Sequence, residues 1–180
     1  MPVMTSDAMA RMMHCVAVAM FLLPSASYAQ RVPEYELKAA FAYNFVLFTE
    51  WPADTVYEGG TLNICINPNS AMRPSLNSLQ GKPAKGRKIL IRALAVPDDI
   101  RSCHVLFIDS TDSERWLQIE RHLRNASVLT ISDEDGSPEG GIIELSSDGN
   151  RVVFDIDMKK ARNARLVLSS KLLRLARAVQ

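Results

Sequence analysis

The sequence predicts a single α/β domain with a mixed, mostly parallel sheet flanked by helices. Short apolar runs of strand length alternate along the chain with segments of helical periodicity, and this alternation is typical of a sheet built through helical crossovers. The run 105–108 is wholly apolar, as expected for a strand that is covered on both faces. The last two runs are separated only by turn-forming residues, which favours an antiparallel hairpin.

The first element is predicted to be an aromatic helix. Leu37, Phe41, Phe45 and Phe48 recur at helical spacing and form one large apolar stripe. The helix must end before Pro52, because a proline pushes the preceding residue out of the helical region. We expect this stripe to be buried, as in a helix that docks on the core of the domain.

The central part of the chain alternates strands and helices. Gly81 ends a short helix, and Ser113 or Ser110 is the expected N-cap of a longer one. We expect strands at 62–66, 88–92, 105–108 and 128–131, and helices at 75–80 and 113–124.

The C-terminal part is predicted to form a hairpin, with strands at 142–145 and 152–156, followed by one long final helix over 159–178. The apolar face of that helix would carry Ala161, Ala164, Leu168, Leu172, Leu175 and Val179, and its other sides Lys159, Lys160, Arg162, Lys171, Arg174 and Arg177. Two interpretations stay open: a docked helix with a solvated face, or a basic surface for an acidic partner or an anionic membrane.

The first 29 residues have the pattern of a secretory signal peptide. Arg11 precedes an apolar run over 12–23, and Ser27-Tyr28-Ala29 offers small residues at a cleavage site. The run is about 12 residues long, short of the ~20 that a membrane span needs. We therefore expect cleavage after Ala29, a domain over 30–180 and a periplasmic location; an uncleaved anchor is the rival interpretation.

Two cysteines, Cys65 and Cys103, remain after such cleavage. An even pair in an exported chain predicts one disulfide, with two buried free thiols as the alternative. The sequence contains no Cys-x-x-Cys motif, which is the usual sign of a catalytic redox pair.

The remaining composition argues against several classes of function. The formal net charge is +1, which gives no reason to expect nucleic-acid binding. His104 and His122 do not have the spacing of metal ligands, and we find no nucleophile elbow, phosphate loop or dinucleotide fingerprint. We therefore expect a binding protein with no cofactor and no catalytic residues.

Two polar loops are expected where ligands bind to parallel sheets, beyond the carboxyl ends of strands. One is Asp109-Ser110-Thr111, and the other contains Ser132, Asp133 and Asp135. The second loop would suit a cationic group, although capping and turn formation explain the same residues.

Several segments in order resemble the YfiR family of bacterial periplasmic proteins. They cover nearly everything after residue 33, and Asp157 departs from the asparagine usual in the family. The segments are 39–52 (AAFAYNFVLFTEWP), 62–66 (LNICI), 81–82 (GK), 103–108 (CHVLFI), 128–133 (VLTISD), 140–143 (GGII), 153–157 (VFDID) and 166–176 (LVLSSKLLRLA).

The resemblance implies a periplasmic repressor of an inner-membrane diguanylate cyclase, which lowers cyclic di-GMP and restrains biofilm formation. It implies binding to the periplasmic sensor domain of the cyclase, sequestration by an OmpA-like outer-membrane lipoprotein, and a possible homodimer. Aromatic and basic residues are enriched at interface hot spots, so the expected partner surface contains Tyr43, Glu50, Trp51, Lys171, Arg174 and Arg177. The alternatives are a small-molecule-binding protein that acts as a signalling input, with the 132–135 loop as its anchor, and a hydrolase with an unrecognised site.

Overall fold

The computed structural model describes residues 33–133, 140–149 and 151–180, all of which belong to one unit that begins at Val32. The predicted signal peptide lies outside the described residues. The strands are β1 (Thr49–Glu50), β2 (Thr61–Ile66), β3 (Pro83–Ala84), β4 (Arg87–Ala93), β5 (Val105–Ile108), β6 (Leu129–Asp133), β7 (Ile143–Asp148), β8 (Arg151–Ile156), β9 (Val167–Leu168) and β10 (Ala178–Val179). The helices are α2 (Glu34–Leu47), α3 (Arg73–Asn77), α4 (Trp116–Leu123), α5 (Met158–Asn163) and α6 (Ser170–Leu173), with 3₁₀ turns η1 (Glu58–Gly60), η2 (Pro97–Ser102) and η3 (Ser110–Arg115).

One eight-stranded sheet dominates the fold, in the order β10-β8-β7-β6-β5-β2-β4-β3. Strands β4, β2, β5, β6 and β7 are parallel neighbours, whereas β8 runs antiparallel to β7 and β3 antiparallel to β4. The predicted mixed, mostly parallel α/β fold and the β7–β8 hairpin are therefore confirmed. After β2 the chain forms β4 on one side of β2 and then crosses to form β5 on the other, so the winding reverses between β2 and β5.

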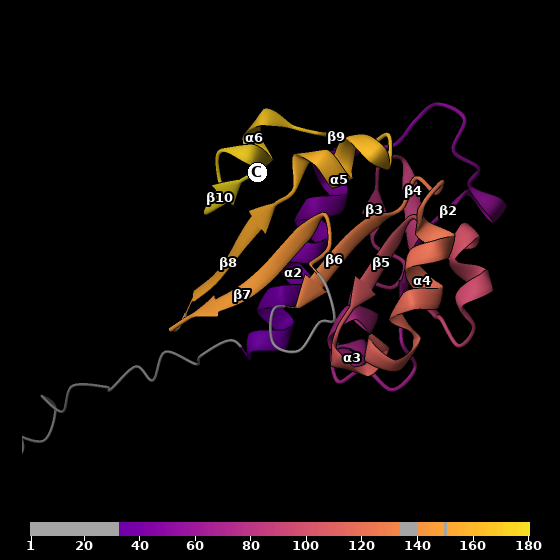
Figure 1. Ribbon diagram of the computed structural model, residues 1–180, viewed down its shortest axis with the longest axis horizontal. Coiled ribbons are helices and arrows are strands. Elements are labelled where there is room, and N and C mark those ends of the chain that lie inside the picture. The colour runs from indigo at the N-terminus through magenta and orange to yellow at the C-terminus, as the bar shows by residue number, and fades with distance from the viewer. Residues whose placement is uncertain (1–32, 134–139, 150) are drawn as a thin grey trace, which may run out of the picture. The chain divides into compact units, whose positions relative to one another are not determined.

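Both faces of the sheet are covered, as the apolar β5 predicts. Val105 and Phe107 point into the core beneath α2, and Leu106 and Ile108 point into a second cluster beneath α4 and η2. Successive side chains of a strand point to opposite faces, so a strand between two helical layers must be apolar throughout. Figure 1 shows α2 passing behind β6, β7 and β8.

Helix α2 buries its predicted aromatic face against the hairpin. The rings of Phe41 and Phe45 contact the ring of Phe154 in β8, with centroids 5.8 Å and 4.9 Å away. The helix ends at Leu47, earlier than Pro52 requires, because residues 49–50 pair with β9 as strand β1.

The long final helix predicted over 159–178 is wrong. The chain forms α5, β9, α6 and β10 in its place, gathered beyond the end of β8 (Figure 1). Helix α5 ends in a Schellman motif: Leu166 N–H donates to the Ala161 carbonyl and Arg165 N–H to the Arg162 carbonyl, with Arg165 in the left-handed region at φ 57°. Ser169 then caps α6 by accepting a hydrogen bond from Leu172 N–H.

The C-terminal segment does not form one helix because two parts of it pair with other strands, and this tertiary pairing overrides its helical periodicity. Strand β9 pairs with β1 and β10 pairs with β8, so backbone groups that a helix would satisfy internally are satisfied by other strands. The 113–124 helix is also shorter than predicted: η3 precedes α4, and Asp109, not a serine, is the N-cap, in a capping box with Asp112.

Candidate functional site

Cys65 and Cys103 form the predicted disulfide, with their Cα atoms 5.8 Å apart. The bond ties strand β2 to the segment that enters β5, and both cysteines are buried. The free-thiol alternative is therefore excluded in this structure.

His104, next to the disulfide, is a buried structural histidine. Its Nδ1 accepts a hydrogen bond from Asn63 N–H (2.9 Å), and its Nε2 lies 3.1 Å from the Val56 carbonyl. These two partners require the neutral tautomer with the proton on Nε2. Burial lowers the pKa of His104, and the nearby Arg87 guanidinium also lowers it.

A stack of side chains continues from His104 to the surface. The Tyr57 ring lies parallel to the imidazole at 4.4 Å, and the Arg87 guanidinium covers the other face of Tyr57 at 3.7 Å. This stack holds the loop between β1 and β2 against the sheet, which gives His104 a structural role.

Three residues of the expected partner surface lie at the end of α2 and make intramolecular contacts. Trp51 is half-buried, and its Nε1–H donates to the His104 carbonyl at 3.2 Å. The Tyr43 hydroxyl donates to the Pro83 carbonyl at 2.8 Å, and exposed Glu50 forms an ion pair with Lys85. Trp51 therefore has a clear structural role in addition to any role in binding.

The other three lie in residues 158–180, which we call the basic cap. This segment contains seven basic residues and no acidic residue: Lys159, Lys160, Arg162, Arg165, Lys171, Arg174 and Arg177. Arg165 pairs with Asp54 and Arg177 with Asp155, each at 3.0 Å. Lys171 and Arg174 are exposed and form no ion pair within the described part of the chain.

The β1–β9 ribbon brings the two groups together, because Glu50 pairs in register with Val167 of the basic cap. Val167 and Leu175 are 64% and 69% exposed, so apolar side chains accompany the charges. Arginine is enriched at interface hot spots, and the exposed apolar side chains add surface that a partner could cover. Sequence reasoning missed these two residues, because a continuous helix would have buried Leu175.

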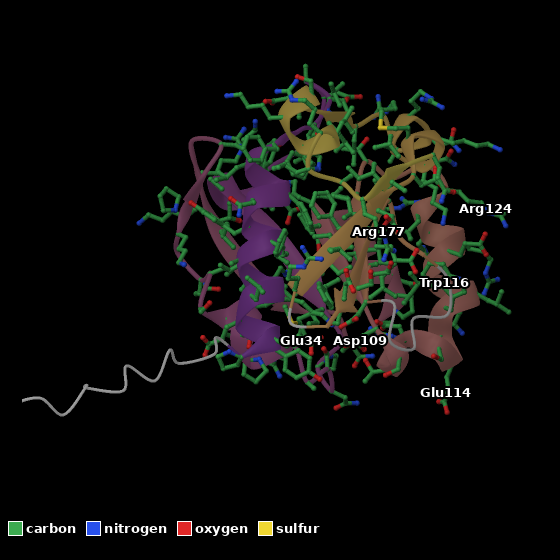
Figure 2. The ribbon with its side chains drawn as sticks, turned by 90° about the vertical axis from the view of Figure 1, so that its left-hand side faces the viewer. Glu34, Asp109, Glu114, Trp116, Arg124 and Arg177 are labelled. Carbon is green, nitrogen blue, oxygen red and sulfur yellow. A yellow bond between two sulfur atoms is a disulfide. The ribbon has the colours of Figure 1, made fainter. Side chains whose placement is uncertain are left out.

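A second candidate site is a cavity of about 250 Å³ at the carboxyl ends of the central strands. Its walls come from the first turns of α2, the loop after β2 and the ends of β5 and β6. Figure 2 shows Glu34 and Asp109, two of its lining residues, at the same lower end of the molecule. The lining residues are Glu34, Tyr35, Lys38, Asn69, Ala71, Met72, Asp109, Ser110, Thr111 and Asp133.

Lys38 is the buried charge of this cavity, with only 1% of its side chain exposed. Its Nζ lies 2.8 Å from both carboxylate oxygens of Asp133 and 2.6 Å from Glu34 Oε1. Burial by itself lowers the pKa of Lys38, but the hydrogen bonds to Asp133 and Glu34 outweigh burial and raise it. The Glu34–Lys38 spacing of four residues was visible in the sequence, but the partner 95 residues away was not.

The predicted ligand loop is only partly within the described residues. Ser132 is buried and its Oγ accepts a hydrogen bond from Gly141 N–H at 2.7 Å, and Asp133 holds Lys38. Asp135 lies outside the described residues. The Asp109-Ser110-Thr111 loop lines the same cavity as Asp133, as the carboxyl-end argument predicts.

Two carboxylates have lowered pKa values because each accepts a hydrogen bond from an arginine. The Arg177 hydrogen bond lowers the pKa of Asp155, and the Arg165 hydrogen bond lowers that of Asp54.

No three His, Cys, Asp or Glu side chains in the described ranges are placed to hold one metal ion. No described helix is long and apolar enough to cross a bilayer.

Asp157, the departure from the family pattern, is the N-cap of α5 and accepts a hydrogen bond from Lys160 N–H at 2.8 Å. Asn and Asp serve this role almost equally, because the cap needs only an acceptor.

The described residues form a small α/β domain with one disulfide, a structural histidine and charged surfaces. The model of the YfiR/HmsC-like family (DUF4154) matches residues 35–177, so the chain belongs to this family. Membership indicates a periplasmic regulatory protein. No curated protein matches the chain.

Two solved structures are similar to the chain. One is a conserved domain protein from Vibrio cholerae O1 biovar El Tor strain N16961, with a TM-score of 0.48 and 10% identity over 82% of this chain and 60% of that one. The other is the ABC domain in complex with L-Trp from Streptococcus pneumonia, with a TM-score of 0.48 and 11% identity over 67% of this chain and 56% of that one. The chain thus spans less than two thirds of each.

Proposed function

We propose that this protein represses an inner-membrane diguanylate cyclase by binding the periplasmic sensor domain of that enzyme, so that cyclic di-GMP and biofilm formation stay low. The observation that carries the proposal is the family match over residues 35–177. An OmpA-like outer-membrane lipoprotein acts as the competing partner: when it binds the repressor, the cyclase is released. Such a partner shifts the equilibrium between repressed and active cyclase. The shift is limited by the difference between its affinity for the free repressor and its affinity for the cyclase-bound repressor.

The basic cap supports the proposal as the surface that meets an acidic partner. Lys171 and Arg174 are exposed and form no ion pair in the described part of the chain, and exposed Leu175 follows Arg174. Complementary charge raises the rate of encounter and selects the partner, and apolar contacts then slow dissociation. Trp51 is a poorer probe of this surface, because it donates a hydrogen bond to His104 and packs on the core.

The test begins with deletion of the gene. Cyclic di-GMP should rise in the deletion strain only when the cognate membrane cyclase is present. Unchanged cyclic di-GMP with the cyclase expressed would rule out repression.

The surface is tested with the double variant Lys171→Glu/Arg174→Glu. Both positions are exposed, so the free energy of unfolding should change by about 0.5 kcal/mol or less for each. Binding to the purified sensor domain should weaken at least tenfold, mainly through a slower association rate that also loses its salt dependence. Lys88→Glu is the matched control, because exposed Lys88 lies on β4 near the opposite edge of the sheet. Equal binding by the double variant and the control would exclude the basic cap as the interface.

The location is part of the proposal and is tested separately. Intact mass of the protein released from the periplasm should correspond to a chain that begins at Gln30. Recovery of the full-length chain in the membrane fraction would show that the N-terminal segment is an uncleaved anchor.

A further inference from the structure

The cavity between the ends of β2 and β5 lies where the winding of the parallel strands reverses. Strand β2 is followed by β4 on one side and by β5 on the other, so the loops after β2 and β5 diverge to opposite faces of the sheet. In open α/β sheets, ligands bind in the crevice that this divergence creates. Asn69 and Met72 from the first loop and Asp109 from the second line the cavity.

The charge of the lining selects the ligand. Glu34, Asp109 and Asp133 contribute three carboxylates, and Lys38 contributes a single ammonium group. The lining therefore carries a net formal charge of −2. Lys38 is almost fully buried beneath Glu34 and Asp133, so an arriving ligand meets carboxylates and not the ammonium group.

Asp109 is held in place by its neighbours and still has room for a ligand. One oxygen, Oδ1, accepts hydrogen bonds from Thr111 N–H (2.9 Å) and the Thr111 hydroxyl, and Oδ2 accepts from the Ser70 hydroxyl. A carboxylate offers about four acceptor positions, so Oδ2 can accept one more hydrogen bond. Fixed donors around an acceptor lower the cost of binding, because the carboxylate is already oriented.

Tyr35 adds an aromatic ring at the rim, with 44% of the residue exposed. A cation over an aromatic face gains further attraction. The cavity volume of about 250 Å³ corresponds to roughly eight water molecules at their share of liquid volume. This space suits a ligand the size of an amino acid or a short polyamine.

We propose that this cavity binds a small organic cation, whose ammonium group donates to Asp109 and Glu34 beside the ring of Tyr35. A metal ion fits the cavity less well, because no three acidic side chains in the described ranges converge on one point. The bound cation links the first turn of α2 to the loops after β2 and β5. This inference does not depend on repression of a cyclase, since binding is measured on the purified protein alone.

The experiment measures melting temperature and affinity with putrescine, spermidine and L-arginine as probes. Succinate is the anionic counterpart of putrescine, calcium chloride tests for a metal, and potassium chloride corrects for ionic strength. At least one organic cation should raise the melting temperature beyond potassium chloride at equal ionic strength, and succinate should not. Amide NMR shifts on binding should be concentrated at residues 34–38, 69–72 and 109–111.

Asp109→Asn is the decisive variant, because asparagine keeps the N-cap but removes the charge. It should weaken binding of the cation at least fivefold. Asp98→Asn makes the same chemical change in η2, which precedes β5 and so lies toward the opposite end of that strand, and it should change affinity less than twofold. The inference is overturned if no organic cation binds, if Asp109→Asn binds as well as Asp98→Asn, or if only calcium stabilises the protein.

Discussion

Replacement of Lys38 by methionine tests whether the buried ion pair is as desolvated as its geometry indicates. The Lys38 side chain is 1% exposed and that of Asp133 is 9% exposed. Removal of one partner of a buried pair leaves the other charge without compensation, which typically costs about 3–5 kcal/mol. Methionine keeps most of the aliphatic volume of lysine, so the loss reports on charge and not on a cavity. We therefore expect Lys38→Met to lower the free energy of unfolding by about 3 kcal/mol or more.

The assay is urea unfolding at neutral pH, with Lys85→Met as the control. Lys85 also binds a carboxylate, that of Glu50, but the Glu50 side chain is 66% exposed, so its loss should cost about 1 kcal/mol or less. Addition of Asp133→Asn to Lys38→Met should recover part of the loss in the free energy of unfolding, because the buried carboxylate that has lost the Lys38 ammonium is then neutral. Equal, small losses in Lys38→Met and Lys85→Met would show that the Lys38 ammonium is effectively solvated and would refute this reasoning.

The pH dependence of the pair supplies an independent check. The pKa of Lys38 is raised above 10.5 in the folded protein, so its contribution is complete below the unfolded pKa and is lost as pH rises through the folded pKa. The pKa of Glu34 is lowered from 4.5 by the hydrogen bond from Lys38, so its contribution is present above pH 4.5 and is lost on acidification. Lys38→Met should weaken the pH dependence of the free energy of unfolding in both the alkaline and the acidic range.

Three further predictions follow from single contacts. Because the pKa of His104 is lowered from 6.5, unfolding free energy should fall as pH drops from 7.5 to 5.5, less so in His104→Leu; a wild-type protein equally stable at both pH values would contradict this. Cys65→Ser should lower stability by about 4 kcal/mol for a bridge that spans 38 positions, and alkylation of oxidised mature protein should find no free thiol. Asp157→Asn should stay within about 0.5 kcal/mol of wild type, whereas Asp157→Ala should lose about 1 kcal/mol, because only the first keeps the α5 N-cap.

The strands were predicted well because burial on both faces leaves a signal in the strand itself. Strand β5 has the bounds predicted from its apolar run, β2 begins one residue earlier than predicted, and β4 extends one residue further at each end. The aromatic helix was also predicted, since Phe41 and Phe45 mark a helical face in any context. The disulfide followed from compartment and cysteine count, and the structure adds only its place between β2 and the entry to β5.

The C-terminal segment was predicted poorly because its structure depends on partners far away in the sequence. Leu168, Leu172 and Leu175 repeat as a helix would, but the backbone of Val167–Leu168 pairs with Thr49–Glu50, more than a hundred residues earlier. No local pattern in residues 158–180 records that strand. Arg165 also occupies a left-handed position that glycine usually marks, so the end of α5 had no sequence signal.

The sequence by itself determined the fold class, the two-faced sheet, the cysteine pair and the family, because each depends on residue type and local spacing. Only the tertiary structure decided which polar residues meet. Lys38 and Asp133 are 95 positions apart, and the crossing from β4 to β5 sets the β2 and β5 loops around one cavity. Likewise, pairing with β1 and β8 turned a predicted basic helix into the basic cap. Contacts of this kind are fixed by the order of strands in the sheet, and that order is a property of the whole chain.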